Sequence, residues 1–333
     1  MNQRLALLAA AVLLTTACAV SALGDDFSSY TNDEMFAMLE SASGSSSVDC
    51  GPIIAELLTR QATGSLRSDV KMSCGDYYVQ TTIVTPNKAG WALNGSGGQG
   101  YALPDSHWIG HALGGAATRL IWVGESGGTI LRVRGLGAHV ERITFQGCRF
   151  TGSTTELPTS RAGIGIEISG LAQPPTGKHS FEDISIIGCD TAIDCPEGTH
   201  ADQLDWRHLV VQLCSTVYHV DNLQSVCHRI RGLTALQGCD TVFDFEDGGE
   251  LECSSVSTTS CQLLHVGNPN WNTGHFFVEN WSIDNVARDV QVLAVDGNGP
   301  CNVHISGWAD HLVTFVSNVT GTGTVATIEL DQR

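Results

Sequence analysis

Acidic and imidazole side chains recur at one position of a repeated segment, and these residue types transfer protons and hold metal ions. Glu167, Asp194, His219, Asp244 and His265 occupy the same place in successive copies. If the copies stack as neighbouring β-strands, these residues lie about 4.8 Å apart. Carboxyl groups at that spacing raise one another's pKa, which is how proteins make a general acid. We therefore predict that Asp194, His219, Asp244 and Glu167 are catalytic.

If the protein acts on a carbohydrate, two classes of reaction fit this file of side chains. A glycoside hydrolase that retains configuration has its two carboxyl groups about 5 Å apart, and one that inverts it has them up to about 9.5 Å apart. Glu167 and Asp194, one copy apart, fit the first spacing, and Asp194 and Asp244, two copies apart, fit the second. In a lyase, His219 would instead abstract a proton from the substrate.

A second outward file follows two residues later in each copy and adds ligands for a cation. It contains Asp221 and Glu246, whose carboxylates are candidates to hold Ca²⁺ against a uronate carboxylate. Arginines at the start of both files are suited to clamp a substrate carboxylate, and a tryptophan in the loop NPNWNTG is placed to stack on a sugar ring. The residues predicted to bind substrate are Arg132, Arg134, His265 and Trp271.

The same pattern also has a purely structural interpretation. Half-exposed strands carry outward polar residues in any case, and His219 between Asp194 and Asp244 would balance charge. The chain would then be a non-catalytic β-helix that binds glycans or serves as a surface module. A deep groove walled by insertions at 151–163 and 170–180 would favour the enzyme, and a flat column would favour the binding module.

The repeat itself predicts the fold. GCDTAIDC at 188–195 returns as GCDTVFDF at 238–245, with a looser copy, LCSTVYHV, at 213–220. Each copy follows an alternating apolar segment and continues into a second short strand, which is typical of one coil of a parallel β-helix. A β-sandwich, the competing fold, would show hairpin turns and no fixed period. One cysteine closes each copy: Cys148, Cys189, Cys214, Cys239 and Cys261.

Strand alternation predicts which side chains point inward. The apolar residues Ile193, Tyr218, Phe243 and Leu264 should face the core, and the acidic and imidazole file should face outward. The cysteines should also stack inward, as a ladder of thiols that pack like small hydrophobic groups. The residues of this ladder are Cys189, Cys214 and Cys239.

The N-terminus has the features of an export signal. Arg4 precedes an apolar run at 5–14, and small residues follow, so residues 1–22 are predicted to be a signal peptide. The tract LLTTAC offers a lipid anchor at Cys18 as the alternative. No other apolar run reaches the length of a membrane span. We expect a secreted or cell-envelope protein.

The segment between the signal and the repeats divides into two parts. Residues 23–48 are rich in Ser, Asp and Gly and are predicted to be flexible. Apolar side chains at helical spacing then predict a helix at about 52–61, which caps a solenoid domain extending over 49–333. Cys50 and Cys74 lie outside the repeats and are the candidate disulfide pair.

The composition limits the partners. The 333-residue chain has a formal net charge of −18, and 16% of its residues are charged. Such a surface repels polyanions, so we expect no nucleic-acid partner. The expected partner, an extracellular polysaccharide, is what the family resemblance described next implies, and Ca²⁺ is the one cofactor we consider.

Four segments resemble the N-terminal half of the pectate-lyase-like superfamily. CGDYYV, WALNGSGG, TILRVRG and VERITFQG follow the predicted helix in the order found there, and the likeness extends over about residues 50–330. The resemblance implies a right-handed parallel β-helix and a carbohydrate-active protein. The signatures of polygalacturonases and the R-x-x-x-R-x-P pattern of pectate lyases are absent, so neither mechanism carries over. A tailspike-like homotrimer, also found in this superfamily, is disfavoured by the export signal.

Overall fold

The computed structural model describes most of the chain after the first 25 residues. Numerous short gaps interrupt it, and the longest lies between residues 97 and 117. The described residues are 26–97, 117–150, 157–169, 176–199, 201–222, 225–235, 238–259, 262–268, 274–283, 289–297, 299–309, 314–320 and 322–332.

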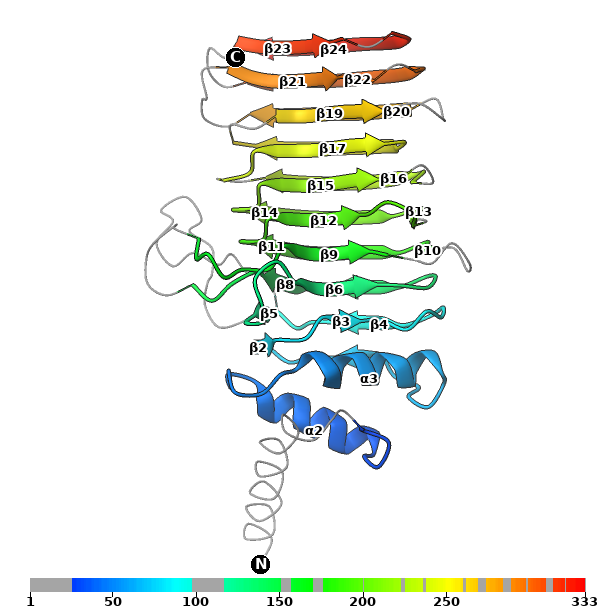
Figure 1. Ribbon diagram of the computed structural model, residues 1–333, viewed down its shortest axis with the longest axis vertical. Helices are drawn as coiled ribbons and strands as arrows, with labels where there is room; N and C mark the ends of the chain where they lie inside the picture. The colour runs from blue at the N-terminus through cyan, green and yellow to red at the C-terminus, as the bar shows by residue number, and fades with distance from the viewer. Residues whose placement is uncertain are drawn as a thin grey trace, which may run out of the picture.

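The described chain is a single-stranded right-handed parallel β-helix, as predicted (Figure 1). Its strands stack in chain order into two long sheets, one of 13 strands and one of nine, and successive coils pair in parallel. A crossover between parallel strands is right-handed in almost all proteins, and here every coil is such a crossover. Helices lie at one end of the stack and the last coil lies at the other (Figure 1).

The strands are short at the N-terminal end and lengthen toward the C-terminal end. The 13-stranded sheet contains β1 (Val70–Lys71), β2 (Gly75–Val79), β4 (Ala92–Asn94), β5 (Thr118–Trp122), β7 (His139–Glu141), β8 (Ile143–Gln146), β11 (Ser180–Ile187), β14 (Asp205–Gln212), β16 (His228–Ala235), β18 (Glu250–Thr258), β20 (Gly274–Ile283), β22 (Cys301–Ala309) and β24 (Thr324–Gln332). The nine-stranded sheet contains β3 (Ile83–Val84), β6 (Thr129–Val133), β9 (Ile164–Ile168), β12 (Thr191–Cys195), β15 (Thr216–Asp221), β17 (Thr241–Asp247), β19 (Gln262–Asn268), β21 (Asp289–Val295) and β23 (Thr314–Val319). A small additional sheet pairs β10 (Thr176–Gly177) with β13 (Ala201–Asp202).

The corner between the two sheets explains the repeated GCDT sequence. The residue before the cysteine is in the left-handed region in three successive coils, with φ values of 72° at Gly188, 55° at Leu213 and 79° at Gly238. Glycine adopts this conformation without a steric penalty. The backbone therefore turns sharply at this point, and the chain passes from the 13-stranded sheet into the nine-stranded one.

The interior of the solenoid is filled by stacked apolar residues. Ile193, Tyr218, Phe243 and Leu264 are fully buried, which confirms their predicted inward orientation. Aromatic rings also stack between coils, since the ring centroids of Phe181 and Trp206 lie 3.8 Å apart with 9° between their planes. Each coil thus buries its inner face only against its neighbours, as expected for a solenoid.

Two helices cover the N-terminal end of this core. Helix α3 (Gly51–Ala62) buries Ile53, Ile54, Leu57 and Leu58 and is one residue longer at each end than the predicted capping helix. Helix α2 (Asn32–Ala42) lies below it (Figure 1) and falls inside the segment predicted to be flexible. That prediction was wrong because a capping box starts the helix, in which the Thr31 side chain accepts from the Glu34 amide and the Glu34 carboxylate accepts from the Thr31 amide.

The described cysteines are free thiols. Cys50 is buried and Cys74 is exposed, so the predicted disulfide between them is not formed. Helix α3 begins immediately after Cys50 and carries its side chain into the core, away from the surface. Cys148, Cys189, Cys214 and Cys239 are all buried, and Cys261 lies outside the described residues. None of the helices in the described part of the chain is long and apolar enough to cross a membrane.

Candidate functional site: a column on the nine-stranded sheet

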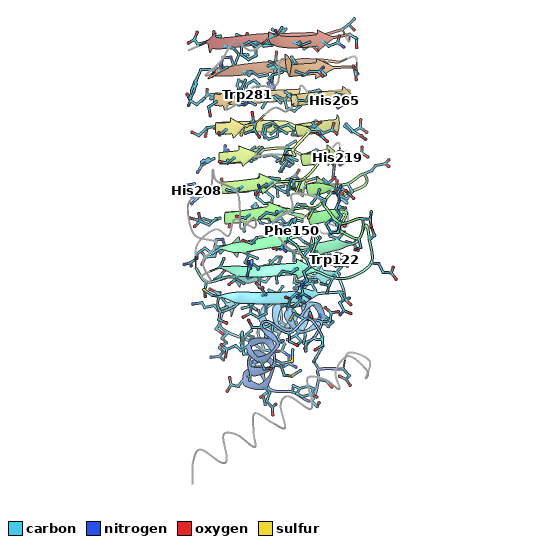
Figure 2. The ribbon with its side chains drawn as sticks, turned by 90° about the vertical axis from the view of Figure 1, so that its left-hand side faces the viewer. Trp122, Phe150, His208, His219, His265 and Trp281 are labelled. Carbon is cyan, nitrogen blue, oxygen red and sulfur yellow. The ribbon has the colours of Figure 1, made fainter. Side chains whose placement is uncertain are left out.

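The outward file predicted from the sequence is one continuous column of paired residues. Each residue pairs with the next across a parallel strand boundary, so the predicted register is confirmed. Figure 2 shows His219 and His265 along one side of the solenoid and His208 along another. We use the name column for Arg132, Glu167, Asp194, His219, Asp244 and His265.

The centre of the column is a hydrogen-bonded pair between a carboxylate and an imidazole. Asp194 on β12 is only 8% exposed, and its Oδ1 lies 2.7 Å from Nδ1 of His219 on β15. The hydrogen bond to Asp194 raises the pKa of His219 despite partial burial of the ring. Its other ring nitrogen, Nε2, lies 3.7 Å from Oε1 of the exposed Glu246. The buried carboxylate therefore fixes the ring and directs Nε2 toward the surface.

The same arrangement is repeated two coils further along. Nδ1 of His265 on β19 lies 2.6 Å from Oδ1 of Asp244 on β17. Nε2 of His265 lies 3.2 Å from Oδ2 of Asp296, just after β21. The hydrogen bond to Asp244 is the main reason that the pKa of His265 rises to about 9. This imidazole has an acidic partner at both nitrogens, which favours its charged form.

At the N-terminal end of the column, two charged side chains form an ion pair with each other. Glu167 on β9 is 6% exposed, and its two carboxylate oxygens lie 2.8 Å from Nε and 2.9 Å from Nη2 of Arg132. The Thr129 hydroxyl also lies 3.2 Å from Glu167. This geometry is bidentate and charge-assisted. Arg132 and Glu167 therefore satisfy each other, and neither presents a free charged group as a substrate clamp or an isolated acid.

The second outward file differs from its predicted register. The pairing of β15 with β17 shifts between Val220 and Asp221, so Asp221 lies beside Asp247 rather than beside Glu246. A β-bulge of this kind inserts one extra residue into a strand, and Glu246 takes that place. Burial, followed by the charges of Glu246 and Asp247, raises the pKa of Asp221. Arg134 makes its described contacts through its backbone, whose amide donates to the Thr85 hydroxyl at 2.7 Å.

The bulge brings Glu246 toward the column. One ligand atom each of His219, Asp244 and Glu246 lies within 4.8 Å of the others, which is a grouping able to hold a metal ion. Asp221, predicted as a metal ligand together with Glu246, is not in that group. Calcium binding at Asp221 and Glu246 stays a prediction.

Two predicted features of the site fall on residues that the structure does not describe. Trp271, predicted to stack on a sugar, lies outside the described residues. Residues 151–156 and 170–175, which belong to the insertions predicted to wall a groove, lie outside them as well.

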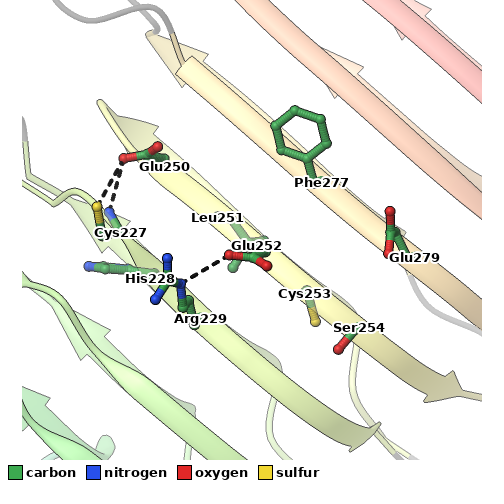
Figure 3. A pocket seen from close by; sticks show the side chains of 10 residues that line it. All are labelled: Cys227, His228, Arg229, Glu250, Leu251, Glu252, Cys253, Ser254, Phe277 and Glu279. Atoms are coloured by element: carbon green, nitrogen blue, oxygen red, sulfur yellow. Dashed lines mark hydrogen bonds and ion pairs between the residues drawn. The ribbon is translucent and has the colours of Figure 1, made fainter.

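A hollow that the sequence interpretation missed lies on the 13-stranded sheet. It has a volume of about 350 Å³ and lies over β16, β18 and β20 (Figure 3). The alternation of each strand was visible in the sequence, but a hollow depends on the relative size of side chains from three coils. Its lining includes Arg229, Glu250, Glu252, Phe277 and Glu279.

Comparisons with known proteins bear on the fold. No family model and no curated protein matches the chain. Among solved structures, DFA-IIIase from Arthrobacter chlorophenolicus A6 in complex with GF2 is 14% identical, with 85% of this chain and 81% of that chain covered and a TM-score of 0.50. At this identity the likeness shows a shared β-helix fold.

Two phage proteins are more distant. ORF18 of Geobacillus virus E2 is 10% identical over 87% of this chain and 60% of that chain, with a TM-score of 0.42. The tailspike protein gp49 from the Acinetobacter baumannii bacteriophage Fri1, a capsular polysaccharide depolymerase, is 14% identical over 85% of this chain and 55% of that chain, with a TM-score of 0.37. Nothing about the function of this chain follows from these two likenesses.

Proposed function

We propose that the chain is a secreted, carbohydrate-active enzyme, a polysaccharide lyase or glycoside hydrolase, that uses His219 as its proton-transfer group. The observation that carries this proposal is the 2.7 Å hydrogen bond between Nδ1 of His219 and the buried Asp194. A histidine whose tautomer and orientation are set by a carboxylate is a common general acid or base. Its Nε2 is then the atom that exchanges a proton with substrate.

The neighbouring groups have positioning and binding roles in this proposal. Asp194 orients the His219 ring, and Asp244 and His265 form the second pair of the same kind two coils away. Arg132 and Glu167 hold the end of the column together through their bidentate pair. Since Glu167 is engaged in this way, the pair Glu167 and Asp194 is less suited to a retaining hydrolase than their spacing alone indicates.

The residues proposed to bind Ca²⁺, and the remaining residues proposed to contact substrate, belong to the second outward file and to a loop. Asp221 and Glu246 are the proposed ligands for Ca²⁺, which would bind a uronate carboxylate. Arg134 and Trp271 are the proposed substrate contacts outside the column. Export by the 1–22 signal, or anchoring at Cys18, would bring this site to extracellular polysaccharide. Membership of the pectate-lyase-like superfamily is part of the same proposal, supported by the β-helix fold and by the four N-terminal segments.

An activity screen tests the proposal. The mature protein is incubated with neutral and uronic-acid polysaccharides, with and without Ca²⁺, and new reducing ends are measured together with ultraviolet absorbance of unsaturated uronates. Reducing ends alone identify a hydrolase, and both signals identify a lyase. Absence of both signals across the panel would contradict an enzymatic function.

A non-catalytic glycan-binding module is the second candidate. The observation that favours it is that the charged side chains of the column are already paired with one another, Glu167 with Arg132 and the two aspartates with histidines, as in a structural charge network. In addition, the hollow of about 350 Å³ lies on the other sheet. Retention on glycan affinity gels without any cleavage would support this function over the first.

A further inference from the structure

The hollow on the 13-stranded sheet combines an exposed aromatic ring with an excess of negative charge. Phe277 on β20 is 42% exposed, and it pairs with Glu252 on β18. Glu252 in turn pairs with Arg229 on β16. Phe277 thus takes an outward position at which the two preceding coils carry charged side chains. In Figure 3 its ring stands on the surface of β20, away from the strand backbone.

Two imidazoles extend the ring surface around Phe277. The His275 and Phe277 rings are 11° from parallel with centroids 6.4 Å apart, and the His304 ring, on the neighbouring strand β22, lies 6.3 Å from Phe277 and is tilted by 42°. The ring face of a sugar can pack on such a platform because its C–H groups are apolar, while its hydroxyl and amino groups reach the polar rim. An exposed phenyl ring with imidazoles and carboxylates around it is a poor fit for a purely apolar ligand.

The charged groups of the hollow are mostly acidic. Arg229 is paired with Glu252 at 3.0 Å, and Glu250 accepts hydrogen bonds from the Cys227 amide at 3.2 Å and from its thiol at 3.4 Å. Among the described residues, Glu250 and Glu279 form no ion pair with a cationic side chain. The hollow therefore contains three carboxylates and one guanidinium, and its unbalanced charge is negative.

We propose that this hollow binds a polysaccharide that carries free amino groups. The sugar ring packs on Phe277, and its ammonium group is attracted both to the π face of the ring and to the carboxylates of Glu250 and Glu279. The formal net charge of −18 also draws a polycationic chain to the surface. This inference rests on the proposed carbohydrate function and names a class of glycan that the hollow recognises, separately from the uronate proposed to bind through Ca²⁺ on the nine-stranded sheet.

Binding is measured by calorimetry with a glucosamine hexamer and with its fully N-acetylated counterpart. The two probes share the sugar ring and differ in the ammonium group. We expect the glucosamine hexamer to bind at least tenfold more tightly in 50 mM salt, and to lose most of that advantage in 500 mM salt because screening weakens charge attraction. Each hexamer is titrated into the protein at both salt concentrations.

Variants locate the binding surface. Phe277→Ala and Glu279→Gln should each weaken binding of the glucosamine hexamer by about tenfold or more. Val325→Ala, at an exposed apolar residue of β24, and Glu182→Gln, on β11 of the same sheet, are the matched controls and should leave the affinity unchanged. The folded state of each variant is checked by circular dichroism.

Three results would overturn the inference. Equal affinity for both hexamers would exclude recognition of the amine, and absence of binding by either would exclude a glycan site. Unchanged affinity in Phe277→Ala and Glu279→Gln would place the site elsewhere. Binding here does not depend on cleavage. Amine-specific binding, together with no cleavage of neutral, uronic-acid or amino polysaccharides, would therefore contradict the proposed enzyme and leave this inference standing.

Discussion

The three carboxylates of the column differ in the cationic side chain that pairs with each of them. Glu167 is held by the guanidinium of Arg132, whereas Asp194 and Asp244 are held by imidazoles. A guanidinium stays charged at every relevant pH, whereas an imidazole can release and take up a proton. The N-terminal end of the column is thus suited to holding the structure, and its centre is suited to proton transfer.

Removal of Arg132 should destabilise the fold. In Arg132→Ala the Glu167 carboxylate remains buried without its charged partner, and we expect the free energy of unfolding to fall by about 2–3 kcal/mol. Urea denaturation at pH 7 measures the change. The matched control is Arg229→Ala, whose pair with Glu252 is exposed on both sides and should contribute less than about 1 kcal/mol. Equal losses in the two variants would contradict the buried pairing of Glu167.

At the level of elements, the sequence predicted the strands of the column well. Inward residues such as Tyr218 and Phe243 alternate with outward ones such as His219 and Asp244, and a period of two is enough to set the register of a half-buried strand. The register then places the outward residues side by side without any knowledge of the loops.

Other features of the structure could not be predicted from that pattern. The bulge after Val220 adds one residue to β17 and places Glu246 near His219, and a single extra residue leaves no signal in the hydrophobic pattern. The helix at Asn32–Ala42 did have a signal, since Thr31 and Glu34 form a capping box, but the Ser-rich composition of the segment is typical of a flexible chain. The pairing of Arg132 with Glu167 depends on the rotamers of both side chains, and the pattern of apolar and polar residues does not reveal rotamers.

The corner before each repeated cysteine makes a prediction about glycine. A Cβ at Gly238 would lie 2.9 Å from Cδ2 and 3.2 Å from Cα of Leu213, in the coil before, and its φ of +79° disfavours other residues. Gly238→Ala should therefore lower the free energy of unfolding by about 2–3 kcal/mol. Gly64→Ala has nearly the same φ, +81°, but open space around the added Cβ, so it should cost only about 1 kcal/mol.

Thermal and urea unfolding of both variants test this comparison. The difference between them isolates the close contact between coils from the backbone preference that they share. If Gly64→Ala were as destabilising as Gly238→Ala, stacking of the corners would not explain the repeated glycine.

At the scale of the whole molecule, two buried histidines make the solenoid sensitive to acid. Burial lowers the pKa of His179 to about 4 and that of His228 to about 4. His179 accepts a hydrogen bond from the Ala138 amide at 3.1 Å, and Nδ1 of His228 lies 3.0 Å from the Tyr218 hydroxyl, so both rings are held neutral. An unfolded histidine has a pKa of about 6.5.

Stability should accordingly fall as the pH is lowered from about 6.5 to 4. In this range the unfolded chain takes up protons that the folded chain does not, and each histidine costs about 2 kcal/mol by pH 5. Urea denaturation at pH 7 and pH 5 measures the loss. The variant His179→Gln keeps an acceptor for the Ala138 amide without titrating, so its loss between the two pH values should be about 2 kcal/mol smaller. An unchanged loss would mean that His179 is not buried in its neutral form.

We propose that the column, and His219 in particular, carries the activity of this protein. The most direct measurement compares cleavage of the best polysaccharide from the screen by the wild type, by His219→Ala and by His208→Asn. His208 is an exposed imidazole on the other sheet that lies 3.0 Å from Asp183, and its φ of 53° suits asparagine. We predict that His219→Ala lowers kcat by about 10²–10⁴-fold while His208→Asn keeps full activity. Full activity in both variants would contradict the account.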